Sequence, residues 1–281
     1  MRNPTCLLGG PGIPDRVTHG HDPDRFVEIG SLSKVFTGTV LARLTEQGVL
    51  DADTALCELV DEVDAGCPVT LRHLAEHTSG LPRLPPQPTG PPGDPYAHFT
   101  EPALRTALKG LSPRPRDEPE YSNLGYAALG LALSTATGRT YEQLVDEYVL
   151  QPLELPAGSV TASPPRERRL VPRTLFGRPR PMWTLTGAIL PSGGLWATPR
   201  TMARVLVGLL VERRLGAPAA TWQRGGPVLW HNGATRDASV VAAAHDDGRW
   251  LLLHRYGAAP ERTDRLAVAT LTSAPSLASD D

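Results

Sequence analysis

The sequence predicts a mixed α/β fold of the α+β type, in which one antiparallel sheet is built from both ends of the chain. Runs with strand character lie at residues 5–17 and again at residues 228–256. The middle of the chain instead shows helical periodicity interrupted by proline-rich segments. Because an isolated hairpin is only marginally stable, we expect the strands from the two ends to pair in one sheet, flanked by helices and carrying an inserted helical lobe.

The length of 281 residues suits one large domain. We expect a single domain over residues 1–281, with an α/β lobe from about 1–50 and 185–281 and a helical lobe from about 51–184. A functional site would then lie in the cleft between the two lobes.

The composition is that of an ordinary globular protein. An apolar content of 40% and a formal net charge of −2 give no reason to expect a nucleic-acid or membrane partner. No run approaches the ~18 consecutive apolar residues of a transmembrane helix. The N-terminus lacks the apolar run of a secretory signal, so a cytoplasmic location is expected. Cys6, Cys57 and Cys67 have no metal-binding spacing and are expected to be reduced.

In the first half, residues 31–47 are predicted to form a helix. Apolar side chains recur there at three- and four-residue steps, and Gly48 is a natural end. Two short strands are expected before it, around the glycines at 9–12. Residues 82–95 and 112–119 contain too much proline for regular structure and are predicted loops.

The second half is predicted to change from helices to strands. Helices are expected at 123–137, 141–149, 199–213 and 262–271, and strands at 228–230, 238–244 and 250–256. Asp247-Gly248, between the last two strands, is a strong hairpin signal. Residues 164–181 are rich in proline and arginine and are expected to be irregular.

Ser31 and Lys34 form an S-x-x-K motif at the start of the first predicted helix. Residues three apart share a helix face, so the lysine amine can meet the serine hydroxyl. A lysine desolvated in a cleft has a lowered pKa and can accept the serine proton, which arginine cannot do. Lys109 is the only other lysine in the chain. The alternative is that Ser31 merely caps the helix and Lys34 is solvated.

Tyr121, Ser122 and Asn123 form a second motif, at the start of a predicted helix. A phenol near a lysine ammonium can be held as the phenolate and can carry a proton between the serine and the leaving group. Asn123 can donate to a substrate carbonyl. Alternatively, Ser122 or Asn123 only caps the helix and Tyr121 only packs.

His231, Asn232 and Gly233 form a third motif after an apolar run. On an edge strand beside the cleft, His231 would offer its side chain to the substrate. The N–H of Ala234 would join the N–H of Ser31 in an oxyanion hole. The alternative is a plain hairpin turn, because Asn-Gly is the preferred pair for a type I′ turn.

Five segments in this order resemble the class C β-lactamase-like and penicillin-binding-protein-like family of serine hydrolases, which includes β-lactamases, D-amino-acid peptidases, esterases and acyltransferases. The segments are residues 26–31, 77–82, 121–126, 192–198 and 231–233. The resemblance implies a β-lactamase/transpeptidase-like fold with no cofactor and no metal. The implied catalytic residues are Ser31, Lys34 and Tyr121, and the implied substrate-binding residues are Asn123, His231, Asn232, Gly233 and Ala234.

Two departures from the family pattern bear on activity. His231 stands where true β-lactamases have a lysine that helps to hold the antibiotic carboxylate, which argues against β-lactamase activity. The chain is also short for the family between Tyr121 and His231, so a more open cleft is expected.

These observations predict a serine hydrolase that forms an acyl-enzyme on an ester or amide of a small metabolite, as an esterase or amidase. The alternative is an acyltransferase that passes the acyl group to an amine or alcohol in natural-product biosynthesis. The expected partner is a small ester, amide or peptide-like substrate.

Three other interpretations of the sequence compete with this prediction. His73, Glu76 and His77 spell an inverted zinc-protease pattern, although Thr78-Ser79-Gly80 ends that helix at once. A catalytically inactive binding module on the same fold would not need the three complete motifs. The arginines of residues 166–180 could bind nucleic acid, but their interleaved prolines favour a solvated loop.

Overall fold

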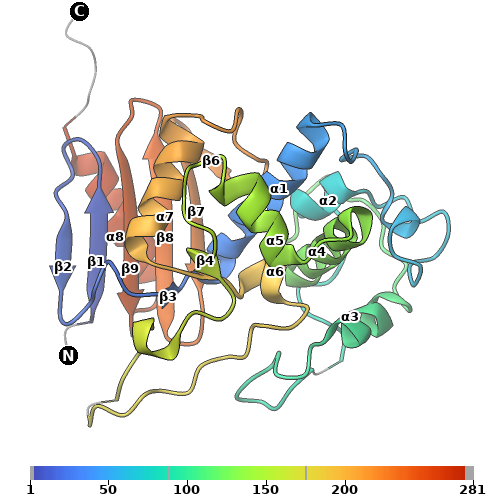
Figure 1. The fold of residues 1–281 in the computed structure, drawn as a ribbon, viewed down its shortest axis with the longest axis horizontal. Helices are drawn as coiled ribbons and strands as arrows, with labels where there is room; N and C mark the ends of the chain where they lie inside the picture. Colours follow the sequence, from blue (N-terminus) through green and yellow to red (C-terminus); the bar gives the residue numbers. More distant parts are fainter. Residues whose placement is uncertain (1–2, 88, 175, 276–281) are drawn as a thin grey trace, which may run out of the picture.

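A six-stranded antiparallel sheet stands beside a mainly helical half in the computed structural model, which describes residues 3–87, 89–174 and 176–275 (Figure 1). The strand order is β2-β1-β9-β8-β7-β6. The strands are β1 (Thr5–Gly9), β2 (Arg16–Thr18), β6 (Gln223–Gly225), β7 (Val228–Ala234), β8 (Ala238–His245) and β9 (Trp250–Tyr256). Because β1 pairs along its whole length with β9, the predicted joining of the two chain ends in one sheet is confirmed.

Two hairpins connect the last three long strands. β8 and β9 meet at a turn around Gly248, which has a φ of 92° and lies where Asp247-Gly248 predicted a hairpin. The turn between β7 and β8 lies between Ala234 and Ala238, after the Asn-Gly pair that the alternative interpretation placed in a turn. Their pairing continues to Ala234 opposite Ser239, so Asn232 and Gly233 belong to a strand and not to a turn.

Both faces of the sheet are buried, which explains the nearly continuous apolar runs of its central strands. Helix α8 (Pro260–Ser273) covers one face, where it packs on Val241 and Ala243 of β8. Helix α7 (Pro199–Leu206) lies on the other face, where Val240 and Ala242 join the main core (Figure 1).

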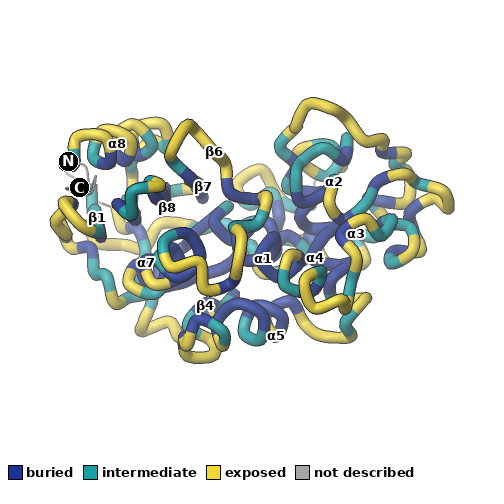
Figure 2. Tube along the Cα trace, turned by 90° about the horizontal axis from the view of Figure 1, so that it is seen from above, coloured by how far each residue is buried: buried dark blue, intermediate teal, exposed yellow. Residues whose placement is uncertain are grey.

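The helical half is organised around two helices that are buried on nearly all sides, α1 (Ser33–Glu46) and α4 (Asn123–Thr137) (Figure 2). The shorter helices are α2 (Leu71–Ala75), α3 (Glu101–Leu108), α5 (Tyr141–Val145) and α6 (Leu190–Gly193). Hydroxyl side chains cap several of them, since Thr70, Thr100, Ser122 and Thr140 each accept a hydrogen bond from a first-turn N–H. α1 contacts α4, α5 and α6, so it lies at the centre of this half.

Several predicted elements differ in detail. The predicted helix 31–47 begins with a 3₁₀ turn, η1 (Gly30–Leu32), before α1 starts at Ser33. The predicted helices 141–149 and 199–213 each finish in a π-helical turn, η3 (Asp146–Leu150) and η5 (Val207–Val211). Two further 3₁₀ turns are η2 (Leu56–Glu58) and η4 (Arg166–Arg168). Within the described residues, no helix combines the length and apolar character needed to cross a membrane.

A second, small sheet was not predicted. It contains β3 (Val27–Glu28), β5 (Trp196–Ala197) and β4 (Val160–Thr161) in the order β3-β5-β4. β3 leads directly into η1, so this sheet holds the segment that precedes Ser31.

The contact between α4 and α6 allows a test of the packing. Gly130 of α4 lies against the Pro191 ring, and a Cβ atom on Gly130 would overlap that ring. We expect Gly130→Ala to lower the free energy of unfolding by ~1–3 kcal/mol, the usual cost of overpacking a filled core, measured by denaturant unfolding. Gly110→Ala is the control, because no atom lies within 4 Å of its Cβ position. Equal effects of the two substitutions would contradict this packing.

Candidate active site

Ser31 lies in η1, between β3 and α1, and is held there by a tight backbone turn. Gly30 has a φ of 51°, and a Cβ atom on it would lie 2.8 Å from the backbone nitrogen of Ala234. Only glycine fits both constraints. Ser33 fixes the turn further, because its hydroxyl donates to Gly30 O at 2.8 Å and accepts from Leu195 N at 3.0 Å.

Lys34 is fully buried in the first turn of α1. Its Nζ lies 3.3 Å from Ser31 Oγ and 2.9 Å from Asn123 Oδ1. It also lies 2.6 Å from the carbonyl oxygen and 3.0 Å from the hydroxyl of Ser192. The structure therefore brings the two residues of the S-x-x-K motif together.

The surroundings of Lys34 favour the neutral amine. Burial lowers its pKa well below the ordinary value of 10.5, and the nearby Arg83 guanidinium lowers it further. A neutral amine has two N–H donors, which the oxygens of Asn123 and Ser192 can accept, and one lone pair. The lone pair is then left for the Ser31 hydroxyl, so Lys34 can act as the base.

Tyr121 also lies beside the serine as predicted, with its phenol oxygen 2.5 Å from Ser31 Oγ. Its ring packs 4.7 Å from the His77 ring, and the Arg83 guanidinium lies 5.0 Å from its centroid. Burial raises the pKa of Tyr121, so it is a neutral phenol. The expected phenolate is therefore not supported, and the phenol can donate to Ser31 Oγ while Ser31 donates to Lys34.

Asn123 lies in the site, but its side chain is committed to other protein groups. Its Oδ1 accepts from Lys34 and from the Ser192 hydroxyl, and its Nδ2 donates to the Tyr96 hydroxyl at 3.3 Å. This geometry suits the orientation of Lys34 better than the predicted donation to a substrate carbonyl.

His231 is a buried, neutral side chain on β7. Its Nδ1 lies 2.6 Å from the Asn232 carbonyl oxygen, so Nδ1 carries the proton and Nε2 is an acceptor. Burial, with a smaller effect from Lys34, lowers the pKa of His231 to about 4. It therefore brings no positive charge to the position where β-lactamases have a lysine.

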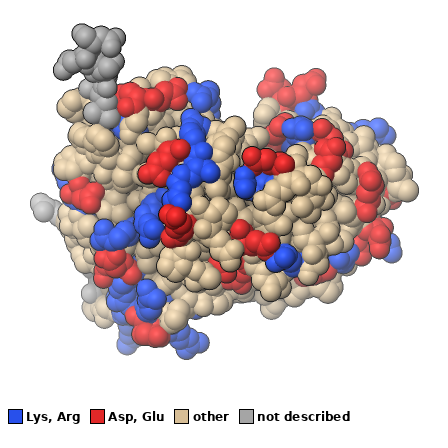
Figure 3. All heavy atoms as spheres, turned by 45° about the horizontal axis from the view of Figure 1, so that its top comes forward, with Lys and Arg blue, Asp and Glu red and all other residues tan. Residues whose placement is uncertain are grey.

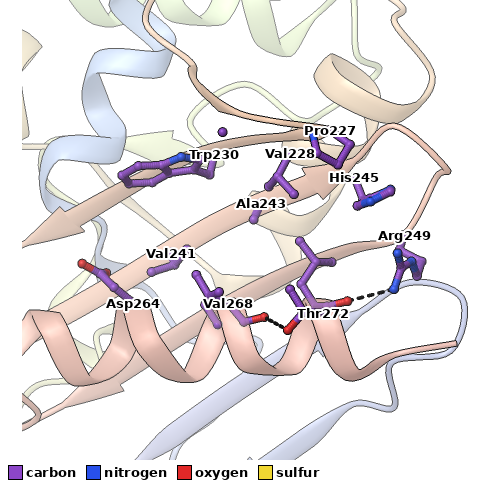
Figure 4. Close-up of a pocket in the computed structure, with 13 residues that line it drawn as sticks. Pro227, Val228, Trp230, Val241, Ala243, His245, Arg249, Asp264, Val268 and Thr272 are labelled. Atoms are coloured by element: carbon purple, nitrogen blue, oxygen red, sulfur yellow. Dashed lines mark hydrogen bonds between the residues drawn. The ribbon is translucent and has the colours of Figure 1, made fainter. Parts of the chain in front are cut away.

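The Asn232 side chain is not brought to the site, contrary to the prediction. It points to the other face of β7, where its Nδ2 donates to Asp264 Oδ2 of α8 at 3.0 Å. The physical reason is the two-residue period of a strand, which sends His231 and Asn232 to opposite sides. That far face borders a groove of about 530 Å³ lined by Trp230 and Val268 among others (Figure 4).

Gly233 and Ala234 run directly beside the nucleophile. A Cβ atom on Gly233 would lie 3.0 Å from the backbone nitrogen of Ser31 and would overlap Ile29 O. A Cβ atom on Gly30 would likewise lie 2.8 Å from the backbone nitrogen and from the carbonyl oxygen of Ala234. This close approach places the Ser31 and Ala234 N–H groups on adjoining segments, as the oxyanion-hole hypothesis requires.

A buried carboxyl group, Glu28, ends the short strand β3 that precedes Ser31 in the chain. It is 4% exposed, and its Oε2 accepts a hydrogen bond from Thr235 Oγ1 at 2.9 Å. Burial, with a smaller contribution from Asp237, raises the pKa of Glu28 to about 7. Sequence reasoning did not single out this residue.

Three other residues of the site were missed. Ser192 belongs to the glycine-rich segment 192–198, which was recognised only as a segment. Arg83 directly follows the segment 77–82, so its position was within reach of the same reasoning. Tyr96 comes from an irregular stretch beyond the proline-rich loop, and no local pattern marks it.

The zinc interpretation does not fit the geometry. α2 ends at Ala75, and His77 lies beyond it with a φ of 62°, so His73 and His77 do not share one helix face. His77 Nδ1 accepts from Ser122 N at 3.1 Å, and burial lowers the pKa of His77 to about 3. His77 thus supports the Tyr121 motif by packing on the ring and bonding to the backbone.

The arginine-rich segment is partly engaged by the protein itself. Arg180 pairs with Asp237 at 2.8 Å, and the guanidinium groups of Arg168 and Arg169 lie over the Phe26 and Trp196 rings. Basic and acidic side chains also lie next to each other on the face shown in Figure 3. The absence of a nucleic-acid partner stays a prediction.

A buried lysine beside a serine, in a helical turn that contacts an antiparallel sheet, is the arrangement expected of this class of serine hydrolases, and comparison with known proteins supports the class. The beta-lactamase family profile matches residues 12–274, so the chain belongs to this family and the predicted resemblance is confirmed.

Two named relatives illustrate the sequence similarity. The D-alanyl-D-alanine-carboxypeptidase/endopeptidase AmpH of Escherichia coli K12 is 34% identical over 191 residues, which cover 64% of this chain and 48% of that protein. Penicillin-binding protein 4 of Amycolatopsis lactamdurans is 28% identical over 137 residues, which cover 47% and 35% respectively. The matched region thus spans half or less of these relatives.

Solved structures confirm the predicted fold. A beta-lactamase/D-alanine carboxypeptidase from Yersinia pestis, complexed with citrate, superposes with a TM-score of 0.76 at 21% identity. A class C beta lactamase from Rhodobacter sphaeroides gives a TM-score of 0.76 at 16% identity. Each match covers 96% of this chain and 93% of the other.

Lys34 can be tested by a substitution that keeps its charge. Lys34→Arg should lower turnover of an activated ester by ~10²-fold or more, because arginine cannot accept the Ser31 proton. Steady-state kinetics measure the effect. Lys109→Arg is the matched control, since Lys109 is exposed in a surface turn after α3 and should retain normal rates. Near-normal turnover in Lys34→Arg would show that this residue is not the base.

Glu28 makes the stability depend on pH. Its folded pKa, about 7, lies above the ordinary 4.5, so its contribution to stability is full below 4.5 and is lost as pH rises through 7. Glu28→Gln removes this loss. From pH 5 to pH 8, the free energy of unfolding of the wild type should therefore fall by roughly 2–3 kcal/mol more than that of the variant. Denaturant unfolding of both proteins at both pH values measures the difference, and parallel pH profiles would contradict it.

Proposed function

We propose that the protein is a serine hydrolase that cleaves an ester or amide of a small metabolite through an acyl-enzyme on Ser31. One observation carries the proposal: Ser31 Oγ lies within hydrogen-bonding distance of both a fully buried lysine amine and a neutral phenol. A serine hydroxyl needs a base to become a nucleophile, and the leaving group needs an acid. Lys34 and Tyr121 are suited to these two tasks.

The proposed reaction follows from the protonation states. Ser31 Oγ attacks the carbonyl carbon while its proton passes to Lys34 Nζ. The N–H groups of Ser31 and Ala234 stabilise the oxyanion. Tyr121 gives its proton to the leaving oxygen or nitrogen, and the proton held by Lys34 then neutralises the phenolate. Water attacks the acyl-enzyme, loses its proton to the same pair, and Ser31 recovers its hydroxyl.

The choice between ester and amide is informed by the relatives. AmpH is named as a D-alanyl-D-alanine carboxypeptidase and endopeptidase, which favours a peptide-like amide as a second candidate substrate. Against a β-lactam, the neutral His231 offers no cation for the antibiotic carboxylate. Transfer to an amine or alcohol instead of water would use the same acyl-enzyme and differs only in the acceptor.

The proposal is tested by intact-mass spectrometry after incubation with activated esters, a D-alanyl-D-alanine-terminated peptide and β-lactams. Acylation should add the mass of one acyl group, and peptide mapping should place it on Ser31. Ser31→Ala should take up no acyl group. Release of the free acid or of an acylated amine separates hydrolysis from transfer. An adduct on another serine would refute the proposal.

The same panel should show a clear preference. Small activated esters are expected to turn over faster than penicillins or cephalosporins, because His231 replaces a lysine and cannot pair with a carboxylate. Initial rates with a chromogenic ester and a chromogenic cephalosporin measure this. A kcat/KM of ~10⁵ M⁻¹s⁻¹ or more for the β-lactam, which is normal for a cognate substrate, would overturn the expectation.

A further inference from the structure

The two segments that carry the proposed oxyanion donors meet backbone to backbone. A Cβ atom on Gly30 would lie 2.8 Å from Ala234 N, and one on Gly233 would lie 3.0 Å from Ser31 N. No side chain therefore stands between the segments to set their separation. The backbone contact limits how closely the segments approach, and contacts at their ends hold them at that separation.

Among the described residues, one side-chain hydrogen bond joins residues 28–32 to residues 233–235. It runs from Thr235 Oγ1 to Glu28 Oε2 at 2.9 Å, and both side chains are buried, at 8% and 4% exposure. Thr235 directly follows Ala234, and Glu28 closes the short strand that leads to Ser31. The bond thus ties the two segments close to both N–H groups.

Glu28 is itself held in place by a chain of buried side chains. Its carbonyl oxygen accepts from His254 Nε2 at 3.2 Å, and His254 Nδ1 lies 2.8 Å from His21 Nε2. The N–H of Asp22 donates to His21 Nδ1 at 2.8 Å. An N–H can only donate, so each imidazole carries its proton on Nε2 and the Glu28 carbonyl receives a true donor. Glu28 also pairs with Trp196 in the small sheet.

We propose that Glu28 is a positioning residue, whose hydrogen bond with Thr235 sets the spacing between the N–H groups of Ser31 and Ala234. Glu28 does not touch the substrate and acts only through the two donors. This inference rests on the proposed function, because an oxyanion hole matters only if Ser31 forms an acyl-enzyme. A carbonyl oxygen becomes strongly negative only in the transition state, so the spacing governs kcat far more than KM.

The test compares an ester with the matching thionoester, in which sulfur replaces the carbonyl oxygen. Sulfur is a weak hydrogen-bond acceptor, so the thionoester profits little from an oxyanion hole. Thr235→Val keeps the shape of the side chain and removes the hydroxyl. We expect it to lower the ester-to-thionoester ratio of kcat by ~10-fold or more, part of the 10²–10³-fold effect of one lost donor. KM should change by less than ~3-fold.

Two variants serve as controls. Thr235→Ser restores the hydroxyl and should recover the wild-type ratio. Thr263→Val removes another buried threonine hydroxyl, which bonds to Ser239 Oγ at 2.6 Å on the α8 side of the sheet. This variant loses a comparable buried hydrogen bond beside the same strand end, but it should keep the ratio.

Glu28→Leu gives an independent approach from the other end of the bond. It removes a buried ionisable group, so it does not threaten folding as a new buried charge would. It should lower the ratio as much as Thr235→Val does. The double variant should be no worse than either single one, since both remove the same hydrogen bond.

The outcomes are separable. If wild-type protein takes no acyl group from the ester, the proposed function fails and this inference falls with it. If the wild type is acylated on Ser31 while both variants keep the ratio, the positioning role is refuted and the proposed function stands. Equal slowing of ester and thionoester would also refute it, because a purely structural defect affects both substrates alike.

Discussion

The candidate active site depends on the burial of one amine. Lys34 Nζ is inaccessible to water, and within the described part of the chain no carboxylate lies at ion-pair distance from it. An unpaired charge in such a place is costly, so the neutral amine is favoured. A lysine that would be a cation in water thereby becomes a base, and the neutral oxygens of Asn123 and Ser192 complete its surroundings.

Keeping that amine dry requires three segments that are far apart in the sequence. α1 supplies the lysine, the first residue of α4 supplies the Asn123 oxygen, and α6 supplies Ser192. Each segment is held by a local constraint. The Ser122 hydroxyl caps α4 by accepting from Gly125 N at 2.8 Å, and α4 and α6 meet where Gly130 leaves room for the Pro191 ring. The helical half therefore encloses one side of the site, because α4 and α6 both contact the Lys34 amine.

Features with a local signal could be predicted from the sequence, and those fixed by distant contacts could not. β9 and the turn at Gly248 follow from strand runs and turn chemistry, and Ser31 and Lys34 follow from helical spacing. The small sheet has strands of two residues, too short to show a period. The motif around Asn232 could not reveal which face of β7 its side chain takes, because that depends on the position of the strand in the sheet. The neutral state of Tyr121 depends on burial by residues such as His77, which lie elsewhere in the chain.

The two buried ionisable groups on either side of Ser31 have opposite protonation preferences. An unfolded chain at neutral pH carries a protonated Lys34 and an ionised Glu28. Burial in the folded chain lowers the pKa of Lys34 and raises the pKa of Glu28, so folding favours the neutral form of each group. Folding thus favours proton release at the lysine and proton uptake at the glutamate, so the changes in charge at these two groups oppose each other. The interior thereby receives a base and an acid a few residues apart. Assembly of the site therefore favours the uncharged forms of a cationic group and an anionic group at once, because burial excludes water from both.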